Sequence, residues 1–346
     1  MRVLVLNSFF TGWTGSEIVA MEVAEHFDAT TSSFVCLEPA ASVLKDWRPL
    51  ADINLSDFDL VWAQHHVILP LLHRHEGANR PFIVFASLSP YEEMETLPAG
   101  VIDNFIDVRV ANSDETAKVQ GADLVMGNAA PEPFHFARNG PVPGSPQKIL
   151  FVSNNQPSEV MDAIPVLRQR GAEVRIVGKD YDYKRLEPAD IMWADAVVTI
   201  GKTVRYALAS GTPVFIYDRF GGDGYLSEDN YTENEAYNFS GRPSCRKLTA
   251  DQLADGILRI PDWSPPAQPS LSAVLGSIVP VPQPHIRHPD LPGLADMAAV
   301  IGRFTADTFN TRNYLQAILN GDAGSWPWLG KAALKKIKRT ILRVRK

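Results

Sequence analysis

A glycine, a lysine and a threonine follow one another at Gly201-Lys202-Thr203, between an apolar run and a stretch with helical spacing. The run at residues 196–200 predicts a short buried strand, and the residues up to Ser210 predict a helix. The N-terminus of such a helix offers unpaired N–H groups and partial positive charge to a phosphate, and the Lys202 ammonium adds a full charge. Two interpretations stay open: a phosphate-binding turn, or an ordinary turn with a surface lysine.

The Gly-Lys-Thr sequence does not form a P-loop. A P-loop has a glycine separated by four residues from its Gly-Lys pair, and that position is Ala196, inside the expected strand. The phosphate cradle of that motif therefore cannot form, and ATPase or kinase chemistry is not expected.

A second turn whose residues suit ligand binding follows the apolar run at residues 214–217. There Asp218 precedes Gly221-Gly222-Asp223-Gly224. We expect a glycine loop here, because glycines let backbone approach a ligand where a Cβ would clash. Asp218 either binds a sugar or ribose hydroxyl or caps the turn. Both turns would lie at the carboxyl ends of parallel strands, the edge where open α/β sheets bind ligands.

The N-terminal half carries a similar but weaker signal. A strand is predicted at residues 2–7, followed by a loop with Gly12 and Gly15 and then by a helix with apolar spacing up to Phe27. We expect Ser16 to cap this helix, and a phosphate can dock at such a helix N-terminus.

These turns belong to two series of alternating strands and helices, which predict an α/β fold with two doubly wound, Rossmann-like domains facing a cleft. Prolines between residues 131 and 146 mark the linker between the two series. The expected divisions are an acceptor-side domain at 1–146, a nucleotide-sugar domain at 147–262, a Pro-rich connection and helical extension at 263–325, and a tail at 326–346. Strands are expected at residues 2–7, 34–37, 59–63, 81–86, 108–111, 124–126, 149–154, 173–178, 196–200 and 214–217, and later helices at 158–170, 251–258 and 291–319.

Several landmarks occur in the order found in a known family. They are the glycine loop after the first strand, Phe58-Asp59-Leu60-Val61, Ala111-Asn112-Ser113, Gly127-Asn128-Ala129 with Phe134, and Ala207-Leu208-Ala209-Ser210-Gly211-Thr212-Pro213-Val214 followed by Asp218 and Gly221-Gly222. The chain thereby resembles the GT-B glycosyltransferases, specifically the glycosyl transferase group 1 families, over residues 2–258.

The resemblance implies a glycosyltransferase that uses a nucleotide sugar, UDP- or GDP-linked, as substrate and needs no bound metal or other cofactor. The departing diphosphate is then stabilised by helix N-termini and basic side chains, with Lys202 as the catalytic cation. The residues expected to bind the donor are Gly12, Gly15, Ser16, Gly201, Thr203, Arg205, Asp218, Gly221 and Gly222.

A base near the acceptor hydroxyl is needed if the transfer inverts the anomeric centre, whereas a retaining transfer needs no such base. His65 and His66 follow an expected strand and serve either as base or as structural hydrogen-bonding residues; His65 is the candidate. Glu92, Glu93 and Glu95 lie in the next strand-end loop, and Glu92 is the candidate for acceptor binding or base catalysis, the others being solvated charges.

The chain departs from the family pattern at three places, one of which is the absence of the family's earlier glutamate from residues 197–200. Tyr206 stands where the family has a glutamate, and Ser153-Asn154-Asn155 stands where an arginine and a lysine are usual. Lys202 and Arg205, one helical turn apart, could replace the lost charge. The departures keep two rival functions open: a GT-B-like binding or scaffold subunit of a glycan assembly system that has lost its chemistry, and a nucleotide-sugar epimerase on the same fold.

The C-terminal tail differs in charge from the rest. Residues 331–346 carry eight basic side chains and no acidic one, so the remainder has a net charge of −15 within a total of −7. The tail, Trp326–Lys346, predicts a basic amphipathic helix beside two tryptophans, which suits an anionic membrane surface, or else a solvated or body-docked helix. The acidic body speaks against nucleic acid as a partner.

Composition predicts a cytoplasmic chain, and the basic tail predicts that it is peripheral at the inner face of the membrane. A glycan or lipid-linked acceptor is what this tail and the family resemblance together imply. The sequence has two cysteines, too few for a disulfide framework, and neither a signal-peptide core nor a run long enough to span a bilayer. His73 and His75 stand two residues apart and do not share a helix face, so no metal site is expected.

Overall fold

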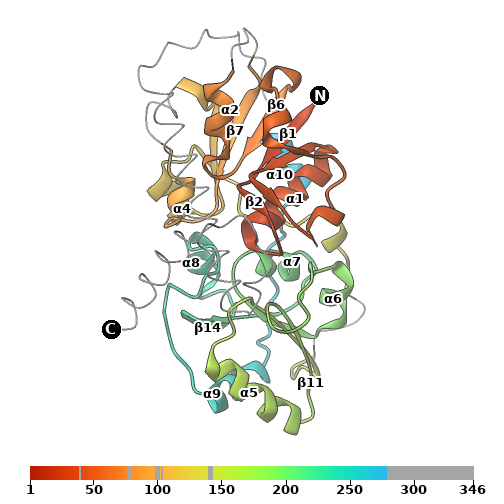
Figure 1. Cartoon of the computed structure of the whole chain (residues 1–346). Helices are drawn as coiled ribbons and strands as arrows, with labels where there is room; N and C mark the ends of the chain where they lie inside the picture. The colour runs from red at the N-terminus through yellow and green to blue at the C-terminus, as the bar shows by residue number, and fades with distance from the viewer. Residues whose placement is uncertain (39, 76–79, 98–101, 103, 139–142, 279–346) are drawn as a thin grey trace, which may run out of the picture. The chain divides into compact units, whose positions relative to one another are not determined.

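The computed structural model describes residues 1–278 apart from 39, 76–79, 98–101, 103 and 139–142 (Figure 1). Two large sheets lie within this part of the chain, and both belong to one compact unit, Met1–Ala295. The fold is α/β, as expected. The predicted helix at 291–319, the tail at 326–346 and most of the extension at 263–325 lie outside the described residues.

The first sheet has seven strands, all parallel, in the order β5-β3-β1-β6-β7-β8-β9. The chain moves outward from β1 through β3 to β5 and then returns to the other side of β1 at β6. The strand order therefore reverses at β1, which is the switch point where doubly wound sheets bind ligands. The strands are β1 Val3–Leu6, β3 Thr30–Ser33, β5 Trp47–Pro49, β6 Leu60–Ala63, β7 Phe82–Ser87, β8 Val108–Ala111 and β9 Leu124–Val125.

Helices α1 Gly15–Phe27, α2 Leu69–His73 and α4 Asp114–Gln120 connect strands of this sheet. The apolar side of α1 packs on the core through Val19, Met21 and Val23, all buried against strand residues such as Val5 and Trp62. This packing fixes the loop before α1 at the carboxyl end of β1.

One predicted strand lies in a different place. Residues 34–37 were expected to join the sheet because they are apolar, but the sheet strand is β3 Thr30–Ser33, and β4 Val35–Cys36 pairs with β2 Phe9–Phe10 in a small separate sheet. The polar strand fits because its hydroxyls are satisfied: Ser32 Oγ donates to Arg48 O at 2.8 Å and Thr31 Oγ1 to Asp46 O at 3.3 Å. Burial of a hydroxyl costs little when it is hydrogen-bonded.

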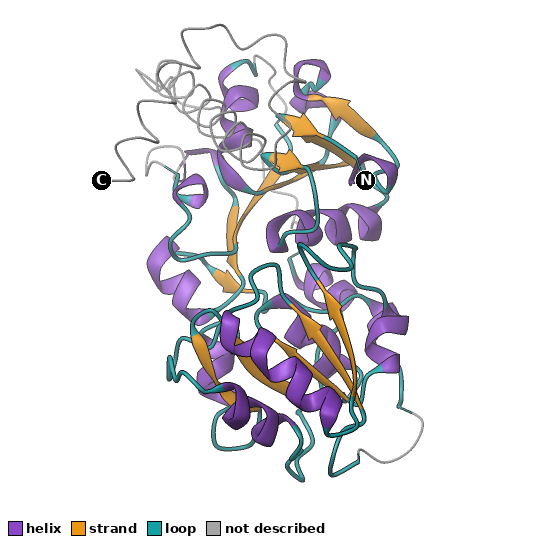
Figure 2. Cartoon of the chain, turned by 60° about the horizontal axis from the view of Figure 1, so that its bottom comes forward, coloured by secondary structure: helices purple, strands orange, loops and turns teal. Residues whose placement is uncertain are grey.

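The second sheet has the order β11-β10-β12-β13-β14, and Figure 2 shows its strands flanked by helices. The first four strands are parallel, and their residues alternate between two apolar cores, with Leu150 and Val197 in one and Phe151 and Val198 in the other. The elements are β10 Lys148–Val152, α5 Ser158–Gln169, β11 Glu173–Val177, α6 Pro188–Trp193, β12 Ala196–Thr199, α7 Lys202–Ala209, β13 Val214–Asp218, β14 Gly221–Tyr225, α8 Tyr231–Ala236 and α9 Ala250–Ile257.

The glycine loop expected at 221–224 is a strand. Residues Gly221–Tyr225 form β14, which pairs antiparallel with β13. Gly221 has a φ of 87°, and a Cβ there would clash with the backbone of Arg246, as one at Gly222 would with the backbone of Ile216. These glycines are therefore required by the protein's own backbone packing.

The segment after α9 returns to the first sheet. Helix α10, Leu271–Ser277, was not predicted; its Leu271 and Leu275 side chains are buried in the core of the first sheet, and Leu271 N donates to Ala130 O at 2.8 Å. Residues far apart in the sequence thus complete one core. In the described part of the chain, no helix has the length and apolar character to cross a membrane.

Candidate active site at the carboxyl edges of the two sheets

Loops at the carboxyl ends of the two sheets touch one another. Asn154, after β10, donates from Nδ2 to Trp13 O at 3.1 Å, and Trp13 N donates to the hydroxyl of Tyr183 at 2.9 Å. At the β9 end of the first sheet, Asn128, which follows β9, donates from Nδ2 to Asn238 Oδ1 at 3.1 Å. The edges at which doubly wound sheets bind ligands are therefore brought together.

Lys202 begins α7, as predicted, but its charge is already paired. Its Nζ lies 2.6 Å from Oε2 of Glu22 on α1, and the two side chains are only 8% and 1% exposed. The Tyr206 hydroxyl donates to the other oxygen of Glu22. Burial raises the pKa of Glu22 while the ammonium of Lys202 acts in the opposite direction. A phosphate can reach Lys202 only by taking the place of this carboxylate.

The first glycine loop is likewise occupied by a protein carboxylate. Buried Glu17 accepts hydrogen bonds from the backbone N–H groups of Thr11 (2.5 Å), Gly12 (2.9 Å) and Thr14 (3.1 Å). The N-cap is Thr14 and not Ser16, which is half-buried inside the helix, whereas Gly15 is exposed with open space around its Cα. The Thr-x-x-Glu spacing is a capping-box signal that identifies this cap from the sequence.

The other expected donor-binding residues of the second sheet contact protein groups. Arg205 is buried, donates to Gln268 Oε1 at 2.7 Å and pairs with Glu235 at 2.9 Å. Asp218 accepts from Ser153 Oγ at 3.0 Å and from Arg219 N at 2.6 Å, and burial raises its pKa. Gly201 caps α7 with a φ of 65°, and Thr203 is half-buried in its first turn.

A buried acid and a buried base meet at the carboxyl end of β6. His65 lies two residues beyond β6, is 2% exposed, and has its Nε2 3.8 Å from Oε1 of Glu95. The other carboxylate oxygen of Glu95 accepts from the N–H groups of Leu88 (2.6 Å) and Ser89 (2.7 Å). His65 has a φ of 65°, a strained backbone conformation for this residue type. Such strain is concentrated at functional sites.

The two groups have strongly shifted proton affinities. Burial raises the pKa of Glu95 to about 8, and burial lowers the pKa of His65 to about 3. At neutral pH the imidazole is therefore neutral and the carboxyl group retains its proton. Above about pH 8 the pair becomes a neutral imidazole beside a carboxylate, the arrangement that can take up a proton from a hydroxyl.

Glu92, the glutamate singled out in the sequence, has a different position. It is half-buried, and its carboxylate accepts from Met94 N at 3.5 Å at the start of a short 3-10 turn. His66 donates from Nε2 to Thr96 O at 2.7 Å. The residue beside His65 is thus Glu95. The sequence does not show which of the three glutamates lies there, because the path of the loop decides it.

Five buried polar atoms at the carboxyl edge of the first sheet, one of them in His65 itself, have no hydrogen-bond partner within the described residues. They belong to residues that follow β1, β6 and β8. An unpaired buried polar atom is costly, and water or a ligand hydroxyl can satisfy it. The atoms are Asn7 Oδ1, Ser8 Oγ, His65 Nδ1, His66 Nδ1 and Asn112 Oδ1.

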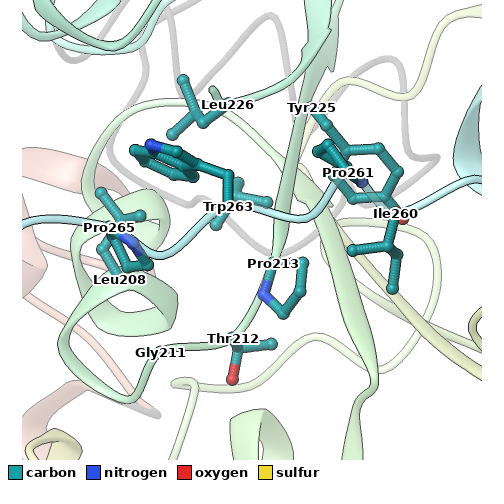
Figure 3. A pocket seen from close by; sticks show the side chains of 11 residues that line it. Leu208, Gly211, Thr212, Pro213, Tyr225, Leu226, Ile260, Pro261, Trp263 and Pro265 are labelled. Atoms are coloured by element: carbon teal, nitrogen blue, oxygen red, sulfur yellow. The ribbon is translucent and has the colours of Figure 1, made fainter. Parts of the chain in front are cut away.

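A pocket in the second half of the chain is lined by neither His65 nor Glu95, and it is too small for a nucleotide sugar. Its free volume is about 10 Å³, room for one water molecule, whereas pockets for small molecules measure hundreds of Å³. Figure 3 shows its apolar lining, which includes Leu208, Pro213, Leu226 and Trp263.

Among the residues described, no group of three or more His, Cys, Asp or Glu side chains is placed to hold a metal ion. No protein-family model matches the chain, and no curated protein matches its sequence.

Proposed function

We propose that this chain is a GT-B-type glycosyltransferase that moves a sugar from a nucleotide-sugar donor to a glycan or lipid-linked acceptor. The observation that carries the proposal is the buried His65–Glu95 pair, which stands next to the switch point of a doubly wound sheet. The order of sequence landmarks and the contacts between the carboxyl edges of the two sheets support it further.

In this proposal His65 is the general base. As the acceptor oxygen bonds to the anomeric carbon, the bond from that carbon to the diphosphate oxygen breaks and the hydroxyl proton passes to an imidazole nitrogen. Above about pH 8, where Glu95 is ionised, its carboxylate lies 3.8 Å from Nε2 and stabilises the imidazolium, so the rate should rise as pH approaches that value. The electron pair of the broken bond leaves with the nucleoside diphosphate.

The diphosphate is bound at the N-terminus of α7, where the Gly201-Lys202-Thr203 turn supplies N–H groups and a charge. The Glu22 carboxylate forms an ion pair with Lys202, so the diphosphate must replace that carboxylate. Binding therefore requires a local rearrangement between α1 and α7. The basic tail, 326–346, holds the enzyme at the cytosolic membrane face, with about 1 kcal/mol of attraction for each basic residue near an anionic surface.

The test combines donor binding with turnover. UDP- and GDP-sugars are screened by thermal shift, since a ligand that binds the folded state at 100 times its Kd adds about 2.7 kcal/mol of stability. With a donor that binds, we expect His65→Ala to lower nucleoside diphosphate release by about 10²- to 10⁴-fold without loss of binding. His73→Ala, an exposed histidine on α2, is the control and leaves the rate unchanged. Folded protein that binds no nucleotide sugar by calorimetry contradicts the proposal.

A second candidate is a GT-B-like binding or scaffold subunit without chemistry. The compensated Lys202–Glu22 pair favours it, because the one lysine at the α7 N-terminus is held by a protein carboxylate. Under this alternative a nucleotide sugar or glycan binds without turnover. Release of nucleoside diphosphate that is lost in Lys202→Ala but kept in Lys148→Ala, an exposed lysine of β10, excludes the scaffold function.

A further inference from the structure

Tyr91 is an exposed aromatic side chain in the loop that carries Glu95. It follows β7 and is 71% exposed, more than any other large hydrophobic or aromatic side chain in the described part of the chain. Its N–H donates to Ser89 Oγ at 3.2 Å, and Ser89 N donates to the Glu95 carboxylate. Two hydrogen bonds through one residue therefore connect this ring to the acid–base pair.

The ring is held although it is exposed. The Tyr91 hydroxyl donates to Oε1 of Glu115 on α4 at 3.2 Å. The guanidinium of Arg242, from the loop after α8, pairs with the other oxygen of Glu115 and lies 5.6 Å from the Tyr91 ring centroid. Residues from both halves of the chain thus fix one exposed ring, which lowers the entropy that a ligand stacking on it must lose.

A second ring stands near the same guanidinium. Phe220, in the turn between β13 and β14, is half-buried, and its centroid lies 5.9 Å from Arg242 Cζ. The exposed Arg219 covers this ring at 4.7 Å. The Arg242 guanidinium thus lies over both rings, and the 71% exposure of Tyr91 leaves much of that side chain open to a ligand.

The charges around Tyr91 select the chemical class of ligand. Arg219 and Arg242 bring two positive charges, and Glu115 together with Glu92 and Glu93, which follow Tyr91 in the sequence, brings three negative ones. Such a set does not attract a dianion such as a nucleotide, but its donors and acceptors match hydroxyl groups. A flat apolar ring flanked by such groups is complementary to a sugar, which has an apolar C–H face and a rim of hydroxyls.

We propose that Tyr91, with Arg242 and Glu115 as positioning residues, forms a subsite that stacks a neutral sugar ring of the glycan acceptor. The subsite places the acceptor chain at the loop Leu88–Thr96, whose Glu95 lies beside His65. This inference rests on the proposed function for the identity of the ligand as acceptor, but binding at Tyr91 is measured without any donor.

The experiment is saturation-transfer NMR and calorimetry on the full chain with three neutral probes: maltohexaose, cellohexaose and chitohexaose. We expect at least one probe to bind, with saturation passing from aromatic protons to sugar C–H protons. Tyr91→Ala then weakens that binding about 2- to 12-fold, since an aromatic contact contributes about 0.5–1.5 kcal/mol and 1.4 kcal/mol is tenfold. Tyr91→Phe retains it, because stacking needs the ring and not the hydroxyl.

The matched control is Tyr181→Ala, which removes another exposed tyrosine, 44% exposed, outside this cluster and leaves probe binding unchanged. Because Tyr91 is exposed, both variants are expected to fold, which circular dichroism verifies. Binding of none of the probes at millimolar concentration, or equal loss in Tyr91→Ala and Tyr181→Ala, overturns the inference. Loss of UMP or GMP binding in Tyr91→Ala with glycan binding unchanged overturns it in favour of a nucleobase platform. Glycan binding without donor binding keeps the subsite and rejects the glycosyltransferase.

Discussion

Two buried carboxylates, Glu22 and Glu95, have different surroundings. Glu22 lies 2.6 Å from Lys202 and accepts a hydrogen bond from Tyr206, both on one helix, so a cation and a hydroxyl compensate it. Glu95 lies 3.8 Å from a neutral imidazole whose backbone is strained and whose Nδ1 has no partner within the described residues. The first arrangement joins α1 to α7. The second holds protonation states that a reaction can use.

The largest expected effect comes from breaking the compensated pair. Glu22→Gln leaves the ammonium of Lys202 buried and unpaired, and we expect it to lower the free energy of unfolding by about 3–5 kcal/mol, measured by urea denaturation. Adding Lys202→Met to Glu22→Gln should restore most of this loss. Glu25→Gln breaks the partly exposed pair with Arg185 and should cost less than about 1 kcal/mol. Equal costs for Glu22→Gln and Glu25→Gln would show that the two helices are not joined by this pair.

The acid–base pair should dominate the pH dependence of stability. The pKa of Glu95 is raised to about 8, so between pH 6.5 and 8 the folded protein retains a proton that the unfolded chain has lost. The free energy of unfolding therefore falls by about 2 kcal/mol as pH rises through that window. Glu95→Gln should remove this fall in denaturation curves recorded at pH 6.5 and 8.

At acid pH, the shifted pKa of His65 changes the free energy of unfolding in the opposite direction. The pKa of His65 is lowered to about 3, so between pH 3 and 4.5 the unfolded chain binds a proton that the folded protein does not. This contribution raises the free energy of unfolding by about 2 kcal/mol from pH 3 to 4.5. His65→Gln should remove it and leave the rise that comes from carboxylates with lowered pKa values, such as Glu132. Between pH 4.5 and 6.5 the two effects oppose each other. A wild-type profile that rises from pH 6.5 to 8 would contradict the burial of Glu95.

The strained backbone at His65 predicts a smaller effect, a difference in stability between two variants of this residue. With a φ of 65°, His65→Gly should be more stable than His65→Ala by about 1 kcal/mol, because only glycine adopts this region without cost. At His66, whose φ is not positive, the order should reverse, with the glycine variant less stable by about 0.5–1 kcal/mol. Thermal denaturation of the four variants measures both differences.

The smallest effect tests the first glycine loop. Thr14→Ala removes the hydroxyl that donates to Glu17 at 2.6 Å and should cost about 1 kcal/mol, whereas Ser16→Ala should change stability by less than half of that. The reverse order in thermal denaturation would assign the cap to Ser16, the residue that the sequence analysis predicts.

The predictions that succeeded rest on local patterns. The strand at 196–200, the turn at Gly201 and the helix after it lie where apolar runs and helical spacing placed them, as does the alternation of strands and helices in both halves. The predictions that failed depended on what a residue contacts. The polar strand β3 and the glycine strand β14 contradict local preference because backbone partners from distant segments satisfy or require those residues.

The sequence by itself determined the α/β class, two series of strands with their carboxyl edges, and the residue types at those edges, because hydrophobic periodicity and turn chemistry act over a few neighbouring residues. Only the tertiary structure decided which charges are paired. It placed Glu22 on Lys202 and Glu95 beside His65, and those pairings depend on contacts across 180 and 30 positions of the chain. The contact of Glu17 with the first glycine loop spans only 5 positions, and the capping-box spacing already contained it.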